Sequence, residues 1–357
     1  MAEKAIILNQ KPQINISRQT AGRMWLVFFC AAAAVVQSSL SDSGASLILA
    51  GCALCSAILA ELLINFRTGS YAKIKDGSAA ASALVFSLLL PNQIHPVYAI
   101  FGALFAMVVV KYSFGGLGSN WLNPSLGGWL FVRLSWPGAF MTALQSSPLQ
   151  VIEESLLNKT DILDTPMKLL QLNGVGTSLD SIVSTFLNNR IFSIVGAQLP
   201  SGYIDLLISR SPGIIADRGL LALLAGTIII TAFRINRSWI PLAFLGIFGI
   251  LVYSFGDLPF NNTFRGGDVL FALFSGGTIT GAFILSSDPV TGAKSSAGVL
   301  AGVILSGFLS WIFRYCGYET YGVFYAIALV NALTPVLRFF EGRFFYSHRL
   351  KIRGRTP

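Results

Sequence analysis

The stretch LFALFSGGTITGAFILSSDPVTGAKSSAGVLAGVILSGFLSWIF, residues 270–313, consists of two strongly apolar runs joined by a turn that contains Asp288 and Pro289. A helix needs about 20 mostly apolar residues to cross the hydrocarbon core of a bilayer, and each run approaches that length. The stretch therefore predicts a pair of membrane-spanning helices. It also raises a question, because an Asp-Pro turn with hydroxyl groups replaces the ordinary charged loop.

The composition of the whole chain is that of an integral membrane protein. Of its 357 residues, 54% are hydrophobic and 11% are charged, whereas soluble domains carry about 25% charged residues. The 35 glycines fit this class, since small residues let transmembrane helices approach closely. The net charge of +9 comes from basic residues in short loops and at both ends. We therefore expect membrane lipid around the protein and no nucleic-acid partner.

The hydropathy pattern predicts an all-α polytopic membrane protein with ten transmembrane helices. With the N-terminus inside, the inside segments hold 17 of the 25 lysines and arginines, Lys111 among them, while the short outside loops hold almost none: Arg265 lies in 256–267 and Arg314 at the exit of the ninth span. This bias places both termini in the cytoplasm, since short cytoplasmic loops are enriched in basic residues. The ten expected spans are 24–40, 44–66, 77–94, 97–114, 126–144, 219–233, 238–255, 268–286, 296–314 and 320–338.

A long segment, residues 145–218, separates the spans into two groups of five. Because five is odd, a duplication would make the halves inverted repeats, as in many transporters. A weak echo between GGLGSNWLNPS and GGTITGAFILSSDPVTG supports that interpretation, since each places an Asn-Pro or Asp-Pro break after paired glycines. The expected domains are a cytoplasmic leader, a first half, an extracytoplasmic loop, a second half and a basic cytoplasmic tail: 1–22, 23–144, 145–218, 219–338 and 339–357.

The cysteines and histidines do not form a ligand set for a metal, a haem or an iron–sulfur cluster. Cys52 and Cys55 form a CxxC pattern inside an apolar run, where small packing residues are a better interpretation than a redox motif. The two histidines, His95 and His348, are far apart in the chain. Any redox chemistry must therefore come from an organic cofactor or a partner, and we expect no catalytic residue in the isolated chain.

Charged residues at membrane depth cost several kcal/mol and need a reason. Glu61 lies inside the second span and Asp76 opens the third, and each reads as a functional carboxylate or as a partner in a structural ion pair. For Arg133, in the fifth span, an interhelical ion pair or a snorkelling end group is the better interpretation. Asn120 and Asn123 precede Pro124 at a spacing that would project two amides to one side of a helix. They could hold a planar polar ligand or simply cap the helix.

Two turns that contain a proline are candidate sites as well, because a residue with a carboxylate or a hydroxyl group precedes each proline. Asp288 precedes Pro289 and can cap a helix start, with Thr291 and Ser295 as further acceptors. In the outer segment, Thr165 precedes Pro166 and an expected helix. A hydroxyl there would lie near backbone N–H groups that favour a phosphate, although its pattern alone indicates a helix cap.

Three blocks together resemble one known family: KDGSAAASALVFSLLLP, FGGLGSNWLNPSLGGWLFVRLSWP and LFALFSGGTITGAFILSSDPVTGAK. It is the family of the D subunit of the Rnf-type ferredoxin:NAD oxidoreductase and the B subunit of the sodium-pumping NADH:quinone reductase. The resemblance runs from about residue 23 to 338. It implies a subunit of a redox-driven ion pump in the inner (cytoplasmic) membrane of a cell, with iron–sulfur and flavin subunits as partners.

The resemblance also implies flavin cofactors. The family carries FMN through a phosphoester to a threonine in the large outer loop, attached by a flavin transferase. Thr165, with Pro166 after it, is the best match, although Leu163 and Asp164 stand where the family has Gly-Ala. Thr177 matches less well because Ser178, not proline, follows it.

A second flavin, riboflavin, lies near an asparagine pair in some family members, and Asn120 and Asn123 match those positions. The resemblance further implies that acidic residues take part in uptake of Na⁺ or H⁺; the matching positions are Glu61, Asp76, Asp217 and Asp288. Two other interpretations of the same sequence stay open. The chain could be a small-solute transporter or channel of the same inverted build, or a flavin-free scaffold member of the family.

Overall fold

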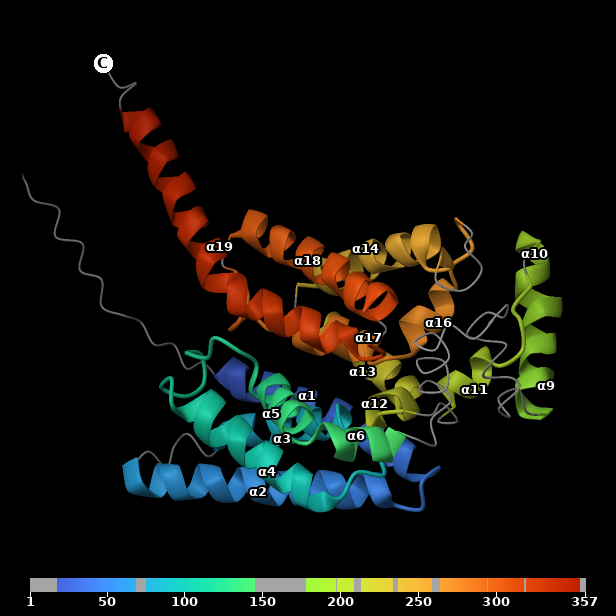
Figure 1. The fold of residues 1–357 in the computed structure, drawn as a ribbon, viewed down its shortest axis with the longest axis horizontal. Coiled ribbons are helices and arrows are strands. Elements are labelled where there is room, and N and C mark those ends of the chain that lie inside the picture. Colours follow the sequence, from blue (N-terminus) through green and yellow to red (C-terminus); the bar gives the residue numbers. More distant parts are fainter. Residues whose placement is uncertain are drawn as a thin grey trace, which may run out of the picture.

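In a computed structural model of the protein, every regular element in the described part of the chain is a helix (Figure 1). An isolated β-bridge joins Pro91 to Ile214. The described residues are 18–68, 75–144, 178–196, 198–208, 213–233, 237–258, 264–293, 295–317 and 319–353.

The first half contains the elements that correspond to the first five expected spans. Helix α4 continues directly into the π-helix η2, and α5 is followed at once by α6. The bounds are α1 Arg18–Ser39, α2 Ala45–Thr68, α3 Ser78–Leu88, α4 Pro96–Phe105, η2 Ala106–Tyr112, α5 Pro124–Ser135 and α6 Pro137–Leu144.

The second half is built from α13 to α19, and shorter helices precede it. The preceding elements are α9 Ser178–Leu187, η3 Asn188–Phe192, α10 Ser193–Val195, α11 Tyr203–Leu207 and α12 Ile215–Arg218. The second half itself comprises α13 Leu220–Ala232, α14 Trp239–Phe255, α16 Val269–Phe274, α17 Thr278–Thr280, η4 Gly281–Leu285, α18 Ser296–Trp311, η5 Ile312–Cys316 and α19 Gly322–Arg353.

By length and composition, four stretches of the described helices are able to cross a membrane: Ala21–Ser39, Ala45–Arg67, Ser296–Cys316 and Gly322–Phe340. Shorter apolar helices in the described part of the chain coincide with four more of the expected spans: Ser78–Leu88, Pro96–Tyr112, Leu220–Ala232 and Trp239–Phe255. The chain is therefore an all-α membrane protein with several spans. The count of ten crossings and the cytoplasmic placement of the termini stay predictions, although α1 begins and α19 ends at the same end of the bundle (Figure 1).

Three expected spans are interrupted or shortened. The span at 126–144 breaks between Ser135 and Pro137, because proline restricts the residue before it and lacks an N–H. The span at 268–286 breaks at residues 275–277, where two glycines take positive φ. The span at 77–94 is helical only to Leu88, and the Ile215 N–H donates to the Leu90 carbonyl at 2.9 Å.

The two halves pack their helices in the same order. In the first half α2 packs against α3 and α4, and α4 against α5; in the second α14 packs against α16 and α18, and α18 against α19. The halves meet through matching members, since α1 packs on α13 and α5 on α19. This arrangement indicates a repeat of five elements, and the inverted orientation of the two halves stays a prediction. The echo between the Asn-Pro and Asp-Pro motifs does not mark it, because one precedes α5 and the other follows η4.

The contact between α1 and α13 depends on two glycines. A Cβ atom on Gly219 would lie 2.4 Å from the Ala34 carbonyl oxygen, and one on Gly226 would lie 2.8 Å from the Cys30 Cβ. Small residues at such crossings let helix backbones approach closely. The interface between the halves is therefore tightly packed at this point.

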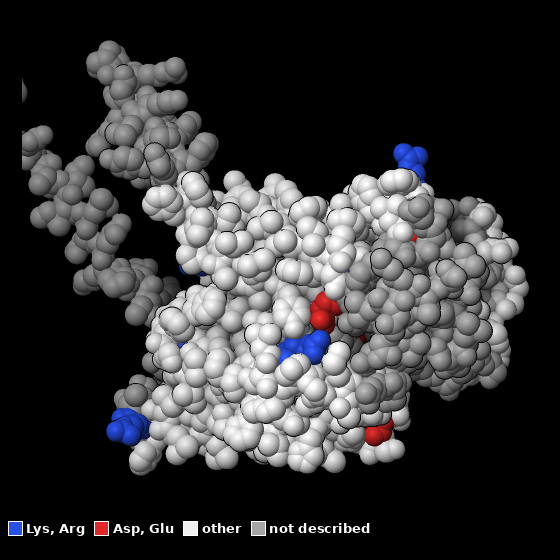
Figure 2. Space-filling view, in the orientation of Figure 1, with Lys and Arg blue, Asp and Glu red and all other residues white. Residues whose placement is uncertain are grey.

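The outer surface of the bundle is apolar. Figure 2 shows a face on which few charged residues are visible over the described helices. Large apolar side chains lie on the surface of both halves, for example Leu63 at 70% exposed and Ile250 at 67% exposed. A water-facing surface seldom carries so large an apolar area without charges, so this surface fits a lipid environment.

Candidate functional site

A cavity of about 250 Å³ lies between the two halves. Its apolar walls come mainly from α1, α3, α13 and η4, and its polar lining residues are Arg23, Ser82, Asn123, Ser125 and Asp288. A mostly apolar pocket with a few convergent polar groups is the usual form of a small-molecule site. This cavity is therefore the candidate ligand site of the bundle.

Asn123 and Asp288 meet in this cavity and join the two halves. The Asn123 amide nitrogen donates to Asp288 Oδ2 at 3.0 Å, and its oxygen accepts the Ser125 N–H at 3.0 Å, which caps α5. Asp288 Oδ1 accepts the Val290 N–H at 3.0 Å. Asn123 is thus both a helix cap and a lining residue of the cavity, so the two interpretations of this residue are compatible.

The expectation that Asp288 caps a helix is wrong. Residues 289–292 form a turn, and the next helix, α18, begins after Ser295, whose hydroxyl accepts the Gly298 N–H at 3.0 Å. Ser295 is therefore the cap. Asp288 instead closes the Asp-Pro turn through the Val290 N–H and fixes Asn123 of the other half.

Asn120 does not lie beside Asn123 on a helix face, because α5 begins only at Pro124 and the preceding residues are irregular. With its amide oriented to suit its neighbours, the Asn120 nitrogen donates to the carbonyls of Gly116 at 2.9 Å and Lys111 at 3.2 Å. Asn120 does not line the cavity. The helical spacing argument fails here, and the assignment of Asn120 to a flavin stays a prediction.

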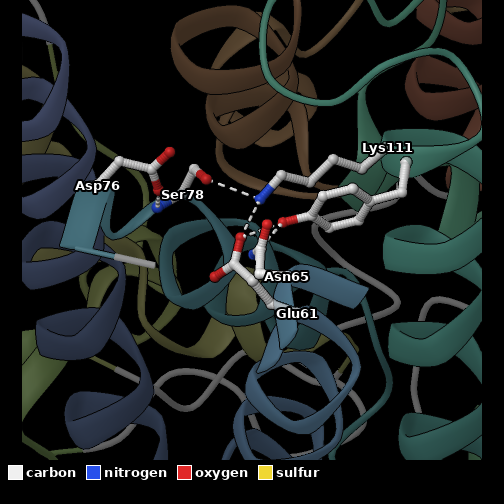
Figure 3. A network of polar contacts seen from close by, with 6 residues as sticks. Glu61, Asn65, Asp76, Ser78 and Lys111 are labelled. Carbon is white, nitrogen blue, oxygen red and sulfur yellow. Dashed lines mark hydrogen bonds and ion pairs between the residues drawn. The ribbon is translucent and has the colours of Figure 1, made fainter. Parts of the chain in front are cut away.

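A second polar cluster lies inside the first half, between α2, α3 and η2 (Figure 3). The Lys111 Nζ atom lies 2.7 Å from Glu61 Oε1 and 2.7 Å from the Ser78 hydroxyl. The Tyr112 hydroxyl donates to the same Glu61 oxygen at 2.8 Å and accepts from Asn65 at 3.1 Å. We call these five residues the Glu61–Lys111 cluster.

The Glu61–Lys111 cluster is buried, with Glu61 4% exposed and Lys111 2% exposed. Asp76 adjoins it, because Asp76 Oδ1 accepts the Ser78 N–H at 2.8 Å. The assignment of Lys111 to a cytoplasmic loop is therefore wrong. Its position within the expected span 97–114 was the signal that sequence analysis overlooked.

A third cluster holds the break in the eighth expected span. Asp217 accepts the Gly277 N–H at 2.8 Å and the Gly276 N–H at 3.1 Å. Arg314 donates to the carbonyls of Ala272 at 2.7 Å and Ser275 at 3.1 Å. The carboxylate thus satisfies donors at the start of α17, and the guanidinium satisfies acceptors at the end of α16, which is the charge distribution that helix ends favour.

Asp217 and Arg314 are both largely buried, at 2% and 8% exposed. Arg314 lies at the end of the ninth expected span, and its side chain points into the break between α16 and α17. Asp217 has a clear structural task there, and its part in ion uptake stays a prediction. Sequence analysis missed the role of Arg314, although its position at the edge of an apolar run was a signal.

Arg133 forms an ion pair, as the sequence indicated. Its Nη2 lies 3.2 Å from Glu319 Oε2, and the two side chains are 14% and 22% exposed. The pair links α5 to the segment before α19. Thr165 and Pro166, the expected point of flavin attachment, lie outside the described residues, and so does Thr177.

Comparison with known protein families shows which family the chain matches. The model of the NQR2, RnfD, RnfE family matches residues 7–345. The D subunit of the proton-translocating ferredoxin:NAD(+) oxidoreductase complex of Clostridium ljungdahlii is 27% identical over 332 residues, which are 92% of each chain.

Two further relatives are each named as the D subunit of an ion-translocating oxidoreductase complex. The protein of Alcanivorax borkumensis is 27% identical over 358 residues, 98% of this chain and 99% of its own. The protein of Escherichia coli O139:H28 is 28% identical over 354 residues, 95% of this chain and 97% of its own. The similarity thus extends over nearly the full length of each chain.

Proposed function

The chain belongs to the NQR2, RnfD, RnfE family, and from this premise we propose that it is the membrane subunit of an ion-translocating oxidoreductase complex. The observation that carries the proposal is the nearly full-length match to three proteins that are named as the D subunits of such complexes. The isolated chain would be inactive, because its partners in the complex would supply the iron–sulfur clusters and other flavins. The membrane would be the inner (cytoplasmic) membrane of the cell.

The proposed cofactor of the outer segment is FMN, joined through its phosphate to the Thr165 hydroxyl by a flavin transferase. Pro166 follows Thr165 as in the family pattern. A covalent bond fixes the flavin without a deep pocket. When bound, a flavin accepts and passes on one or two electrons, which suits a relay between partner subunits.

A second flavin, riboflavin, is proposed for the cavity between the halves. The lining suits a flat ring system with one polar edge, because Asn123 hydrogen-bonds Ser125 and Asp288, whereas Val27, Val85 and Phe283 are apolar. The volume of about 250 Å³ is near the lower limit of common ligand pockets, about 300 Å³. The ring system therefore fits better than the entire molecule.

The chain's own residues would bind and orient the ring. The Asn123 amide bridges the start of α5 and Asp288, so a ligand that replaces one of these hydrogen bonds would contact both halves at once. Arg23 adds a positive charge to the lining, which would favour an electron-rich, reduced ring. The apolar walls would exclude water and strengthen these interactions.

The electron relay is proposed to be coupled to translocation of Na⁺ or H⁺, with Glu61, Asp76, Asp217 and Asp288 as candidate carboxylates. Of these, Glu61 has the strongest support, because its buried carboxylate is bound to side chains that can rearrange. Asp217 has the weakest, because both of its oxygens accept backbone N–H groups.

Two alternative functions can be distinguished from the electron relay by experiment. A small-solute transporter would use the same cavity between the halves, and a flavin-free scaffold would keep the fold without cofactors. Both predict a colourless chain, whereas the relay predicts a yellow one.

The test is flavin fluorescence of the denatured chain on a gel, after expression in cells that contain the flavin transferase. The relay predicts a fluorescent band that Thr165→Ala abolishes and that the matched control Thr177→Ala retains. A dark band for the unaltered chain would reject covalent FMN. A band that is lost only in Thr177→Ala would move the attachment to that residue.

A further inference from the structure

A cavity of about 40 Å³ lies between α18 and α19, which pack side by side (Figure 1). On α18 it is lined by small residues at successive turns, Gly298, Gly302 and Ser306, and on α19 by Asn331 and Thr334. We call this cavity the α18–α19 pocket. The two helices therefore do not close fully on each other along this line.

One polar group of the pocket has no hydrogen-bond partner among the described residues. Asn331 is 5% exposed, and its amide nitrogen is buried without an acceptor. Burial of an amide without a hydrogen bond costs about 1–3 kcal/mol in proteins, and lipid around the helices offers no acceptor. The Asn331 amide therefore needs an acceptor inside the pocket.

The hydroxyl groups of the pocket cannot supply a donor. Ser286, Ser306 and Thr334 each donate their hydrogen to the carbonyl four residues earlier, at 2.7, 2.8 and 3.0 Å. A hydroxyl has a single hydrogen to donate but two lone pairs that accept. The pocket thus presents donors on one amide and free acceptor capacity on three hydroxyl oxygens.

This pattern selects the chemistry of the ligand. None of the described residues that line the pocket carries a charge, so an ion would lose its hydration there without a counter-charge. A metal cation would in addition meet the amide hydrogens of Asn331. A neutral molecule that both accepts and donates fits best, and a buried water molecule needs about 10–15 Å³. The pocket has room for about three.

We propose that the α18–α19 pocket is an internal water site. Its water molecules accept hydrogen bonds from the Asn331 amide and donate to the hydroxyl oxygens of Ser286, Ser306 and Thr334. Water that bridges two protein groups is nearly as favourable as a direct hydrogen bond. The two helices are therefore joined through water at this point, whereas α1 and α13 are joined by direct contact at their glycines.

The water site adjoins the Asp-Pro turn, which separates two cavities. Ser286 and Gly292 line the α18–α19 pocket, and Asp288 lines the cavity between the halves. Arg338 of α19 donates to the carbonyls of Val290 at 3.1 Å and Gly292 at 2.7 Å. Water and Arg338 together thus fix the turn to α19, whichever ligand occupies the other cavity.

The test is pulsed X-ray radiolysis of the purified complex in detergent, followed by mass spectrometry of its peptides. Hydroxyl radicals formed from bound water oxidise the side chains that touch it, even where bulk solvent has no access. Val303, Ile327 and Val330 line the pocket and are 4%, 1% and 7% exposed. We expect all three to be oxidised.

Phe324 is the internal control, because it lies on α19, is 0% exposed and does not line the pocket. A phenyl ring reacts with hydroxyl radicals faster than an aliphatic side chain, yet Phe324 should stay unmodified. Unmodified Val303, Ile327 and Val330 would show a dry pocket and overturn the proposal. Oxidation of Phe324 to the same extent would show general opening of the bundle and would overturn it as well.

Three variants test the role of the polar groups. Asn331→Leu removes the donor and fills part of the space, so oxidation of the lining residues should fall to the level of Phe324. Thr334→Val removes one acceptor at nearly constant shape and should lower the oxidation by less. Ser310→Ala is the matched control, because Ser310 is 0% exposed on α18 but does not line the pocket, and oxidation should be unchanged.

Undiminished oxidation in Asn331→Leu would overturn the proposal, because the radicals would then not come from water bound to the amide. The comparison of the lining residues with Phe324 in the unaltered protein decides the question even if a variant does not fold.

Discussion

Helices α3 and α17 each start after a glycine with positive φ, and each receives a hydrogen bond from a buried base. In the second half both charges bind the backbone of the broken helix: Asp217 accepts two of its N–H groups, and Arg314 donates to two of its carbonyls as well as to the Ser275 and Thr278 hydroxyls. In the first half Lys111 and Glu61 are bound to each other and to hydroxyl groups. Burial of a charge is therefore a weak guide to function by itself, and the partners of the charge are the better one.

We expect the largest loss of stability from replacing a charged side chain that hydrogen-bonds the backbone. Arg314→Met would remove the guanidinium that donates to the Ala272 and Ser275 carbonyls, which would keep the Thr278 hydroxyl as a donor, and would remove the positive charge near Asp217. Loss of one member of such a buried charged network costs about 3–5 kcal/mol, and we expect a large fall in the thermal midpoint of the purified protein.

Arg133→Met is the comparison for that variant, because Arg133 forms a partly exposed pair with Glu319. Exposed ion pairs contribute about 0–1 kcal/mol. If both variants shifted the midpoint equally, the assignment of Arg314 to the helix break would be contradicted.

The first half should respond differently when both charges are removed. Lys111→Met alone would leave the Glu61 carboxylate buried without its counter-charge, at a cost of about 3–5 kcal/mol. Glu61→Gln in the same chain should restore most of that stability, because the remaining groups are neutral. A double-mutant cycle of unfolding free energies measures the coupling. A double variant as unstable as the sum of the two single variants would show that the pair does not interact as the structure indicates.

The glycine before α17 offers a third comparison. Gly277→Ala would place a side chain at φ 68°, with its Cβ 2.3 Å from the Phe324 ring. Left-handed backbone costs about 1–2 kcal/mol for a non-glycine residue, and overpacking adds about 1–3 kcal/mol. Gly116→Ala is the control, because its φ is 92° but its Cβ would meet open space. The midpoint of thermal unfolding of Gly277→Ala should be well below that of Gly116→Ala, and the reverse order would contradict the close approach of Gly277 to Phe324.

The smallest effect on stability concerns the two asparagines. Asn123→Ala removes a helix cap, which costs about 1 kcal/mol, and also removes the contact to Asp288 in the cavity. We expect the non-covalent flavin content of the purified complex to fall in Asn123→Ala and to be retained in Asn120→Ala. Loss of flavin in Asn120→Ala alone would move the second flavin away from the cavity.

Much of the fold could be predicted from the sequence, because long apolar runs have few alternatives to helix in a membrane. All ten expected spans correspond to described helical segments, yet the breaks at 275–277 and before Pro137 were not foreseen. A glycine pair in an apolar run is compatible with an unbroken helix, and the contacts that Asp217 and Arg314 make at the break come from distant parts of the chain.

The sequence indicated which residues belong to the candidate sites, but it did not indicate which of these residues contact each other. Glu61 was singled out because a carboxylate in an apolar run needs a reason. Its partner Lys111 was overlooked because a basic residue near the end of a span is also a common topology signal. The meeting of Asn123 with Asp288 joins residues of the two halves, and such long-range contacts have no local signal in the sequence.

The described bundle and the outer segment differ in what they contribute to the proposed function. The bundle carries the cavity and the buried charges, whereas the proposed covalent flavin would be attached at Thr165. The electron relay depends on that attachment, and the most direct test is a mass spectrum of the intact chain isolated from its native host, followed by peptide mapping. The account predicts a mass increased by FMN less one water, located on the peptide that contains Thr165. An unmodified mass would contradict it.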